Sequence, residues 1–258
     1  AENMRSEGGA IAFAEKVLSL LDEGSFTATY KYAVLLALMD LCLEQTKQSG
    51  APPTSVTTTQ LAAKVIELYW PHTVDFAPPQ LMQGEGRVLY QNQPAKRGSR
   101  RGGQAAILTA IDEFRRAHAD PSATLVRARL KAPKRFAALL RQVEWKLVEM
   151  PLPRLQTFGS YEDAFIYRIN WSREVRRAQF NAVASFDNRI LFVGDAAEHL
   201  VTLTGLLRPL IQRRWAAMVA RFNDDLVQDA ELERFLFGAD RVALAPVRGA
   251  VIELQRGS

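Results

Sequence analysis

Two sets of residues have types and spacings that suit metal or acid–base chemistry. Asp195, Glu198 and His199 offer two carboxylates and an imidazole within five residues. Adjacent residues of a helix, such as Glu198 and His199, point about 100° apart, so they make a poor chelate. A helix that begins at Asp195 would use both acids at its amino end, with the spacing of a capping box. Capping therefore explains this set better than a metal site does.

Glu144 and Lys146 have the Glu-x-Lys spacing of nucleases in which two acids hold Mg²⁺ and a lysine orients water. That chemistry needs a strand edge, whereas residues 136–147 have helical periodicity. Asp40 interrupts an apolar helix, where we expect an Arg or hydroxyl partner, with a catalytic carboxylate as the alternative. The single cysteine, Cys42, lies in the same apolar segment. We therefore predict no catalytic residue, no metal ligand and no cofactor in this chain.

The distribution of charge points instead to the binding of a polyanion. The net charge is +5, but residues 96–154 carry 14 Lys/Arg against 5 Asp/Glu, whereas residues 1–95 carry 6 against 10 and residues 155–258 carry 13 against 13. Each cation that neutralises a phosphate releases condensed counterions, which drives binding to DNA. A solvated basic surface beside acids from elsewhere is the alternative. The nucleic-acid-binding residues that we predict are Lys96, Arg97, Arg100, Arg101, Arg127, Arg129, Lys131, Lys134 and Arg135.

Composition bounds the class of protein. A chain of 258 residues that is 48% hydrophobic and 24% charged is globular rather than disordered or collagen-like. One cysteine and three histidines exclude an internal disulfide and a four-thiolate zinc site. The longest apolar run, residues 32–43, is shorter than the roughly 20 residues of a membrane-spanning helix. The amino terminus has no secretory signal, so we expect a cytoplasmic protein without a membrane partner.

Hydrophobic periodicity predicts a mainly helical fold, so helices are expected to position most of the residues named above. Alternation over residues 164–171 and the run 189–193 predict two extended strands, and Gly159 can turn between strands. The expected fold class is mainly α (α+β), a multi-helix domain with a small β-hairpin or wing. Helical spacing and end signals predict helices over about 11–21, 27–46, 58–70, 104–118, 133–147, 195–219 (kinked at Pro209) and 229–238, and a last one from Pro246.

Long connections and proline clusters suggest how the chain is divided. Residues 71–103 are rich in proline and glycine, and loops of that length are usually functional or mobile. The change of character after Pro151 and Pro153 suggests a helical domain over 1–150 and a hairpin with packed helices over 151–258, with one single domain as the alternative. The two helices before Pro71, with the hairpin, would also suit a helix-turn-helix with a wing.

Several stretches, taken together and in order, resemble the N-terminal region of bacterial HNH endonuclease domain proteins. This resemblance spans nearly the whole chain, although no single piece of it is diagnostic of a mechanism. The stretches are Ser25-Phe-Thr-Ala-Thr-Tyr-Lys-Tyr-Ala, Leu61-Ala-Ala-Lys-Val-Ile-Glu-Leu-Tyr-Trp-Pro, Gly102-Gly-Gln-Ala, Trp145-Lys-Leu-Val-Glu-Met-Pro-Leu-Pro-Arg-Leu-Gln, Leu206-Leu-Arg-Pro-Leu-Ile-Gln-Arg-Arg-Trp and Phe235-Leu-Phe-Gly-Ala-Asp-Arg.

The resemblance implies an accessory role in metal-dependent cleavage of DNA. In proteins of this kind the HNH module follows a segment similar to 247–257, with a cysteine pair, an Asp-His and a divalent metal. This sequence ends at Ser258, so no HNH residue can be assigned to it, and we expect a truncated piece or a natural short form. The predicted function is to bind or position duplex DNA for such a nuclease, in restriction or anti-phage defence. The alternative is a protein-interaction or dimerisation module without direct DNA contact, which uses the apolar region 200–215 to form a homodimer or to bind a defence-system partner.

Overall fold

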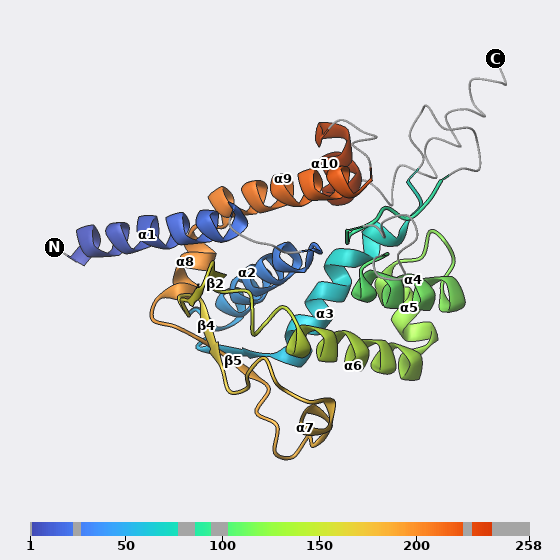
Figure 1. Ribbon diagram of the computed structural model, residues 1–258, viewed down its shortest axis with the longest axis horizontal. Coiled ribbons are helices and arrows are strands. Elements are labelled where there is room, and N and C mark those ends of the chain that lie inside the picture. The colour runs from blue at the N-terminus through green and yellow to red at the C-terminus, as the bar shows by residue number, and fades with distance from the viewer. Residues whose placement is uncertain (1, 23–26, 77–85, 94–102, 224–228, 239–258) are drawn as a thin grey trace.

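Helices make up most of the chain, as the apolar periodicity predicts (Figure 1). The computed structural model describes residues 2–22, 27–76, 86–93, 103–223 and 229–238. No helix in these ranges is both long enough and apolar enough to span a bilayer. The helices are α1 (Glu2–Asp22), α2 (Tyr30–Ser49), α3 (Thr58–Tyr69), the 3-10 helix η1 (Trp70–Thr73), α4 (Ala106–His118), α5 (Leu125–Lys131), α6 (Pro133–Glu149), α7 (Arg177–Asn181), α8 (Ala196–Thr202), α9 (Thr204–Phe222) and α10 (Asp229–Phe237).

Helix α2 lies at the centre of the fold because it is apolar on almost every side. Its residues from Lys31 to Met39 are all buried, and α3, α8 and α9 pack around it. Helix α6 packs on the far side of α3 and against α4, while α10 packs on α9. In Figure 1, α9 and α10 lie above α2, α4 and α5 lie to the right of α3, and α6 lies below α3. The fold is therefore a helical core with α2 and α3 between its outer helices.

The strands form two small antiparallel sheets. β1 (Ser55–Thr57) pairs with β5 (Arg189–Phe192), which pairs in turn with β4 (Tyr167–Ile169), and this places Ile190 between Val56 and Ile169. β2 (Thr157–Phe158) and β3 (Tyr161–Glu162) form a hairpin that turns at Gly159, whose φ of +57° suits glycine. The predicted hairpin is thus confirmed. The three-stranded sheet joins elements from both sides of residue 150.

Helices α3 and α8 differ in how their amino ends are capped. The cap of α3 is Thr57, whose hydroxyl accepts from the backbone N–H of Gln60 at 3.2 Å. In return, the side-chain oxygen of Gln60 accepts from the backbone N–H of Thr57 at 2.9 Å. The next two residues, Thr58 and Thr59, do not cap α3, because their hydroxyls donate to Glu144. Asp195 precedes α8 without a side-chain capping bond, so the predicted capping box is absent there.

The long connection over residues 71–103 is described in part. After η1, residues 86–93 form isolated bridges that pair Phe76 with Arg87 and Ala28 with Asn92. Gln91 in this stretch is completely buried. Residues 86–93 therefore contribute to the core, and the predicted cationic arm over 96–101 lies outside the described residues.

Candidate nucleic-acid interface

Two consecutive helices, α5 and α6, position the predicted DNA-binding residues. The hydroxyl of Thr124 accepts from the Arg127 amide at 3.3 Å and caps α5. Pro133 begins α6, where its fixed φ suits the first turn and its missing N–H costs nothing. Ala128 is the one buried residue of α5, which packs against α4 and α6. The rest of α5 therefore faces outward or is half-buried.

The structure brings five of the nine predicted residues together on these two helices. Three lie on α5 and two in the first turn of α6, and every one of them is exposed. We call these five residues the basic patch: Arg127, Arg129, Lys131, Lys134 and Arg135. The other four, Lys96, Arg97, Arg100 and Arg101, lie outside the described residues.

The basic patch is not neutralised by the residues that the structure describes. From Pro121 to Val143 the sequence has six Lys/Arg and no Asp or Glu. None of the ion pairs between described residues involves the patch. The Arg129 guanidinium lies 5.3 Å from the centroid of the Phe136 ring, a contact that orients it without cancelling its charge. The positive charge of the patch therefore remains available to a ligand.

The amino end of α6 adds to this positive field. Lys134 and Arg135 occupy its first turn, where the helix dipole favours acids and disfavours cations. Ala132, which precedes the helix, has no side chain that can cap it. This local arrangement opposes folding slightly, and a bound anion would relieve it.

A hollow of about 350 Å³ adjoins the basic patch. Arg127 and Lys131, one helical turn apart on the same side of α5, form one wall. His118, Asp120 and Ser122 also line the hollow. The hollow thus combines cationic, imidazole and hydroxyl groups of the kind that contact phosphate oxygens with one carboxylate, Asp120, which opposes an anion.

Glu144 is a structural residue rather than half of a nuclease pair. Its side chain is almost fully buried, and its carboxylate accepts hydrogen bonds from Thr58 at 2.6 Å, Thr59 at 3.0 Å and Arg141 at 3.2 Å. Lys146 instead pairs with Glu149 at 3.0 Å. Residues two apart on a helix point about 200° apart, so Glu144 and Lys146 do not converge on one site.

Asp40 has the arginine partner that the sequence predicted. It forms an ion pair with Arg208 of α9, and burial raises the pKa of its carboxyl group although Arg208 opposes this shift. His199 packs against the ring of Phe13, with centroids 5.2 Å apart. No group of three or more His, Cys, Asp and Glu converges within the described ranges. Burial also raises the pKa of the Cys42 thiol to about 12, which keeps it protonated at neutral pH.

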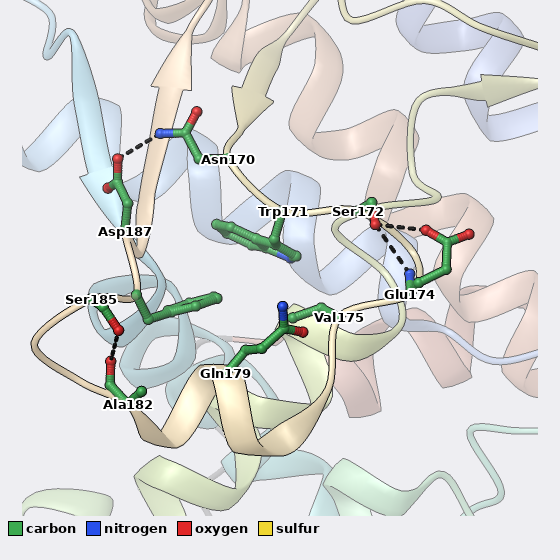
Figure 2. A pocket seen from close by; sticks show the side chains of 10 residues that line it. Asn170, Trp171, Ser172, Glu174, Val175, Gln179, Ala182, Ser185 and Asp187 are labelled. Carbon is green, nitrogen blue, oxygen red and sulfur yellow. Dashed lines mark hydrogen bonds between the residues drawn. The ribbon is translucent and has the colours of Figure 1, made fainter.

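A second hollow, of about 630 Å³, opens between the end of β4 and α7 (Figure 2). Trp171 and Phe186 line it, with ring centroids 5.2 Å apart. At its edge the Asp187 carboxylate accepts from Asn170 at 2.5 Å and from the Arg189 guanidinium, which holds the pKa of Asp187 well below its usual range. Its lining contains acids but neither Lys nor Arg, so it does not suit a phosphate.

Two other predicted surfaces lie within the packed part of the fold. Helix α3, a candidate recognition helix, lies between α2 and α6, and its Lys64 pairs with Glu44 at 2.6 Å and Glu67 at 2.8 Å. In the apolar region 200–215, Leu206 is 54% exposed. The residues of that region that pack in the core are Leu200, Leu207, Ile211 and Trp215.

Sequence reasoning missed helix α5 and its two exposed apolar residues, Val126 and Leu130. The sequence contains two signals for them. Thr124 is a typical cap, and the acid-free stretch from Pro121 to Val143 marks a surface that differs from the rest of the chain.

Fold and surface together define a mainly helical protein with small antiparallel sheets and a basic patch that forms no ion pair within the described part of the chain. The sequence matches the family described as Domain of unknown function (DUF8808) over residues 9–236, so the chain belongs to this family. The matched range includes α5, α6 and the whole basic patch. No curated protein and no solved structure matches the chain.

Proposed function

We propose that this protein binds duplex DNA through the basic patch on α5 and α6. The observation that carries the proposal is five exposed cations, none of which has an ion-pair partner among the described residues, in a stretch of sequence without any acid. A surface of this kind suits the regularly spaced phosphates of a duplex, because phosphate contacts provide affinity that does not depend on sequence.

The adjoining hollow supports the same proposal. Arg127, Lys131, His118 and Ser122 line it, so a backbone phosphate can lie against several donors, and the two cations outnumber the one acid, Asp120. Following the resemblance to HNH endonuclease regions, we further propose that the patch holds DNA for a nuclease module outside residues 1–258. The reading frame beyond Ser258 tests that part directly, since a cysteine pair and an Asp-His are expected there.

Fluorescence anisotropy with a labelled duplex tests the binding itself. We expect binding at about 50 mM salt that weakens steeply as salt rises. Replacing Lys131, Lys134 and Arg135 by Ala should lower affinity about tenfold or more and reduce the salt slope by about 2–3, because each phosphate contact contributes about 0.9 to it.

The matched control removes three exposed cations from α2 and α9. The variant Lys47→Ala, Arg213→Ala, Arg221→Ala changes the net charge equally but leaves the basic patch intact. It should keep the wild-type salt slope. No binding at low salt, or equal losses in the two triple variants, would refute the proposal. Light scattering without DNA checks whether the protein instead assembles with itself.

A further inference from the structure

The exposed side of α5 carries an apolar crest between its cations. Leu130 is 76% exposed and Val126 is 67% exposed, and Leu130 is the most exposed large apolar side chain within the described ranges. The two residues are one helical turn apart, so they lie on the same side of α5. Neither contributes to the core that the described residues form, so packing among those residues does not explain them.

Helical geometry places this crest opposite the buried face. At about 100° per residue, Val126 and Leu130 lie about 160° to 200° around the helix from the buried Ala128. Arg129 lies on one flank of the crest, and Arg127 and Lys131 lie on the other. The apolar crest, Val126 and Leu130, thus points outward with positive charge on both sides.

The ligand that fits has two rows of negative charge with apolar material between them. The minor groove of a duplex has this arrangement, because two phosphate backbones border a groove about 6 Å wide with the stacked bases at its floor. Minor-groove proteins frequently insert an apolar side chain, such as Phe, Leu, Ile or Met, between base steps and bend the duplex. Two apolar side chains are a small area for anchoring to lipid, since such binding scales with the buried apolar area.

We propose that Leu130 acts as a wedge that enters between base steps while the flanking cations hold the two backbones. This inference rests on the proposed DNA binding and specifies its substrate class, which is duplex DNA with an unstacked or easily unstacked step. Opening a base step costs free energy, and a bulge or nick has already met part of that cost. The protein therefore binds bulged or nicked duplexes more tightly than intact ones.

The test compares an intact duplex with the same duplex carrying a bulge, using the wild type and Leu130→Ala. We expect the wild type to bind the bulged duplex about tenfold more tightly, which corresponds to about 1.4 kcal/mol, and to shorten the end-to-end distance measured by energy transfer. Leu130→Ala should lose this preference and the bending but retain salt-sensitive binding to intact DNA. Leu130→Met should retain both the preference for the bulged duplex and the bending, because methionine also inserts between bases.

The matched control is Leu206→Ala on α9, which removes an exposed leucine outside the patch and should behave as the wild type. Thermal melting confirms that each variant is folded. Equal affinity of the wild type for both duplexes, or an equal loss on both in Leu130→Ala, overturns the wedge while DNA binding stands. No binding to either duplex overturns both proposals, and Leu130-dependent binding to phosphatidylserine vesicles would then assign the crest to a lipid surface.

Discussion

The indole N–H of Trp215 donates to the side-chain oxygen of Gln91 over 2.6 Å inside the core, although 124 residues separate them. The same oxygen accepts from the Thr29 hydroxyl at 2.7 Å. Since Thr29 uses its proton there, the Tyr69 hydroxyl donates to Thr29, also at 2.7 Å. Gln91 thus links α9, the start of α2 and α3 through one buried amide.

His72 extends this network to α10. The amide nitrogen of Gln91 donates to Nδ1 of His72 over 3.1 Å. Nε2 of His72 lies 3.0 Å from the carbonyl oxygen of Leu236 and therefore carries the proton. Gln91, which lies in a loop, thus uses its side-chain oxygen and nitrogen to link four α-helices (α2, α3, α9 and α10) and the 3-10 helix η1. These hydrogen bonds explain why this polar side chain is completely buried.

Replacing Gln91 by Leu should destabilise the protein strongly. The substitution deprives the indole of Trp215 and the hydroxyl of Thr29 of their acceptor in the core, and each unsatisfied group costs about 1–3 kcal/mol. We expect the free energy of unfolding to fall by about 3 kcal/mol. Urea denaturation followed by tryptophan fluorescence measures this loss. The control Gln142→Leu, at an exposed position of α6, should change it by less than about 0.5 kcal/mol, and equal effects would contradict the role of the network.

How far the sequence predicts the fold depends on whether the decisive contacts are local. Helix α6 was predictable because Pro133 begins it and its apolar residues recur at helical spacing. Helix α5 was not, because Val126 and Leu130 face outward and Ala128 faces inward, which reverses the usual pattern. The strand β1 lies in a segment that reads as a loop, since its pairing partner β5 is more than 130 residues away.

The candidate site shows the same limit. The sequence shows that cations are concentrated over residues 96–154, but it does not show which of them are exposed. Arg115 illustrates the difference, because it belongs to the same basic segment yet is buried. Its guanidinium donates to the carbonyls of Trp70 at 2.8 Å and Pro121 at 2.7 Å. Only three-dimensional packing separates such a residue from the basic patch.

Glu144 and Lys146 should respond very differently to mutation. Glu144→Ala removes a buried acceptor from Thr58, Thr59 and Arg141, so we expect the free energy of unfolding to fall by about 2–4 kcal/mol. Lys146→Ala removes a partly exposed ion pair with Glu149 and should cost less than about 1 kcal/mol. Thermal and urea unfolding of the two variants give the comparison.

A plasmid assay separates this structural role from a catalytic one. Purified protein with Mg²⁺ should not nick supercoiled plasmid, because Glu144 and Lys146 do not converge. Magnesium-dependent nicking by the wild type that is lost in the well-folded Lys146→Ala would show that the pair is catalytic after all.

Lys31 is a buried cation at the start of the central helix. Its side chain is 1% exposed, and its ammonium group donates to the carbonyl oxygen of Leu21 over 2.9 Å. Burial lowers the pKa of Lys31 to about 8; nearby Asp22 opposes this shift, whereas Arg214 and Arg221 add to it. The folded protein therefore releases this proton far more easily than the unfolded chain, where the pKa of lysine is about 10.5.

This difference predicts that stability rises with pH in mildly alkaline solution. Between about pH 7.5 and 9.5 the folded state loses the Lys31 proton while the unfolded state keeps it, so the unfolded state binds more protons and the free energy of unfolding increases by about 2 kcal/mol. Lys31→Met removes this contribution, so the difference in unfolding free energy between wild type and variant should grow by that amount across the interval. Urea titrations at several pH values measure it, and the exposed-site variant Lys47→Met should follow the wild type. If the unfolding free energies of the wild type and Lys31→Met change in parallel with pH, Lys31 keeps its proton in the folded state. The carbonyl of Leu21 and the ring of Tyr32, whose centroid lies 5.1 Å from the ammonium nitrogen, would then compensate for the burial of the charge.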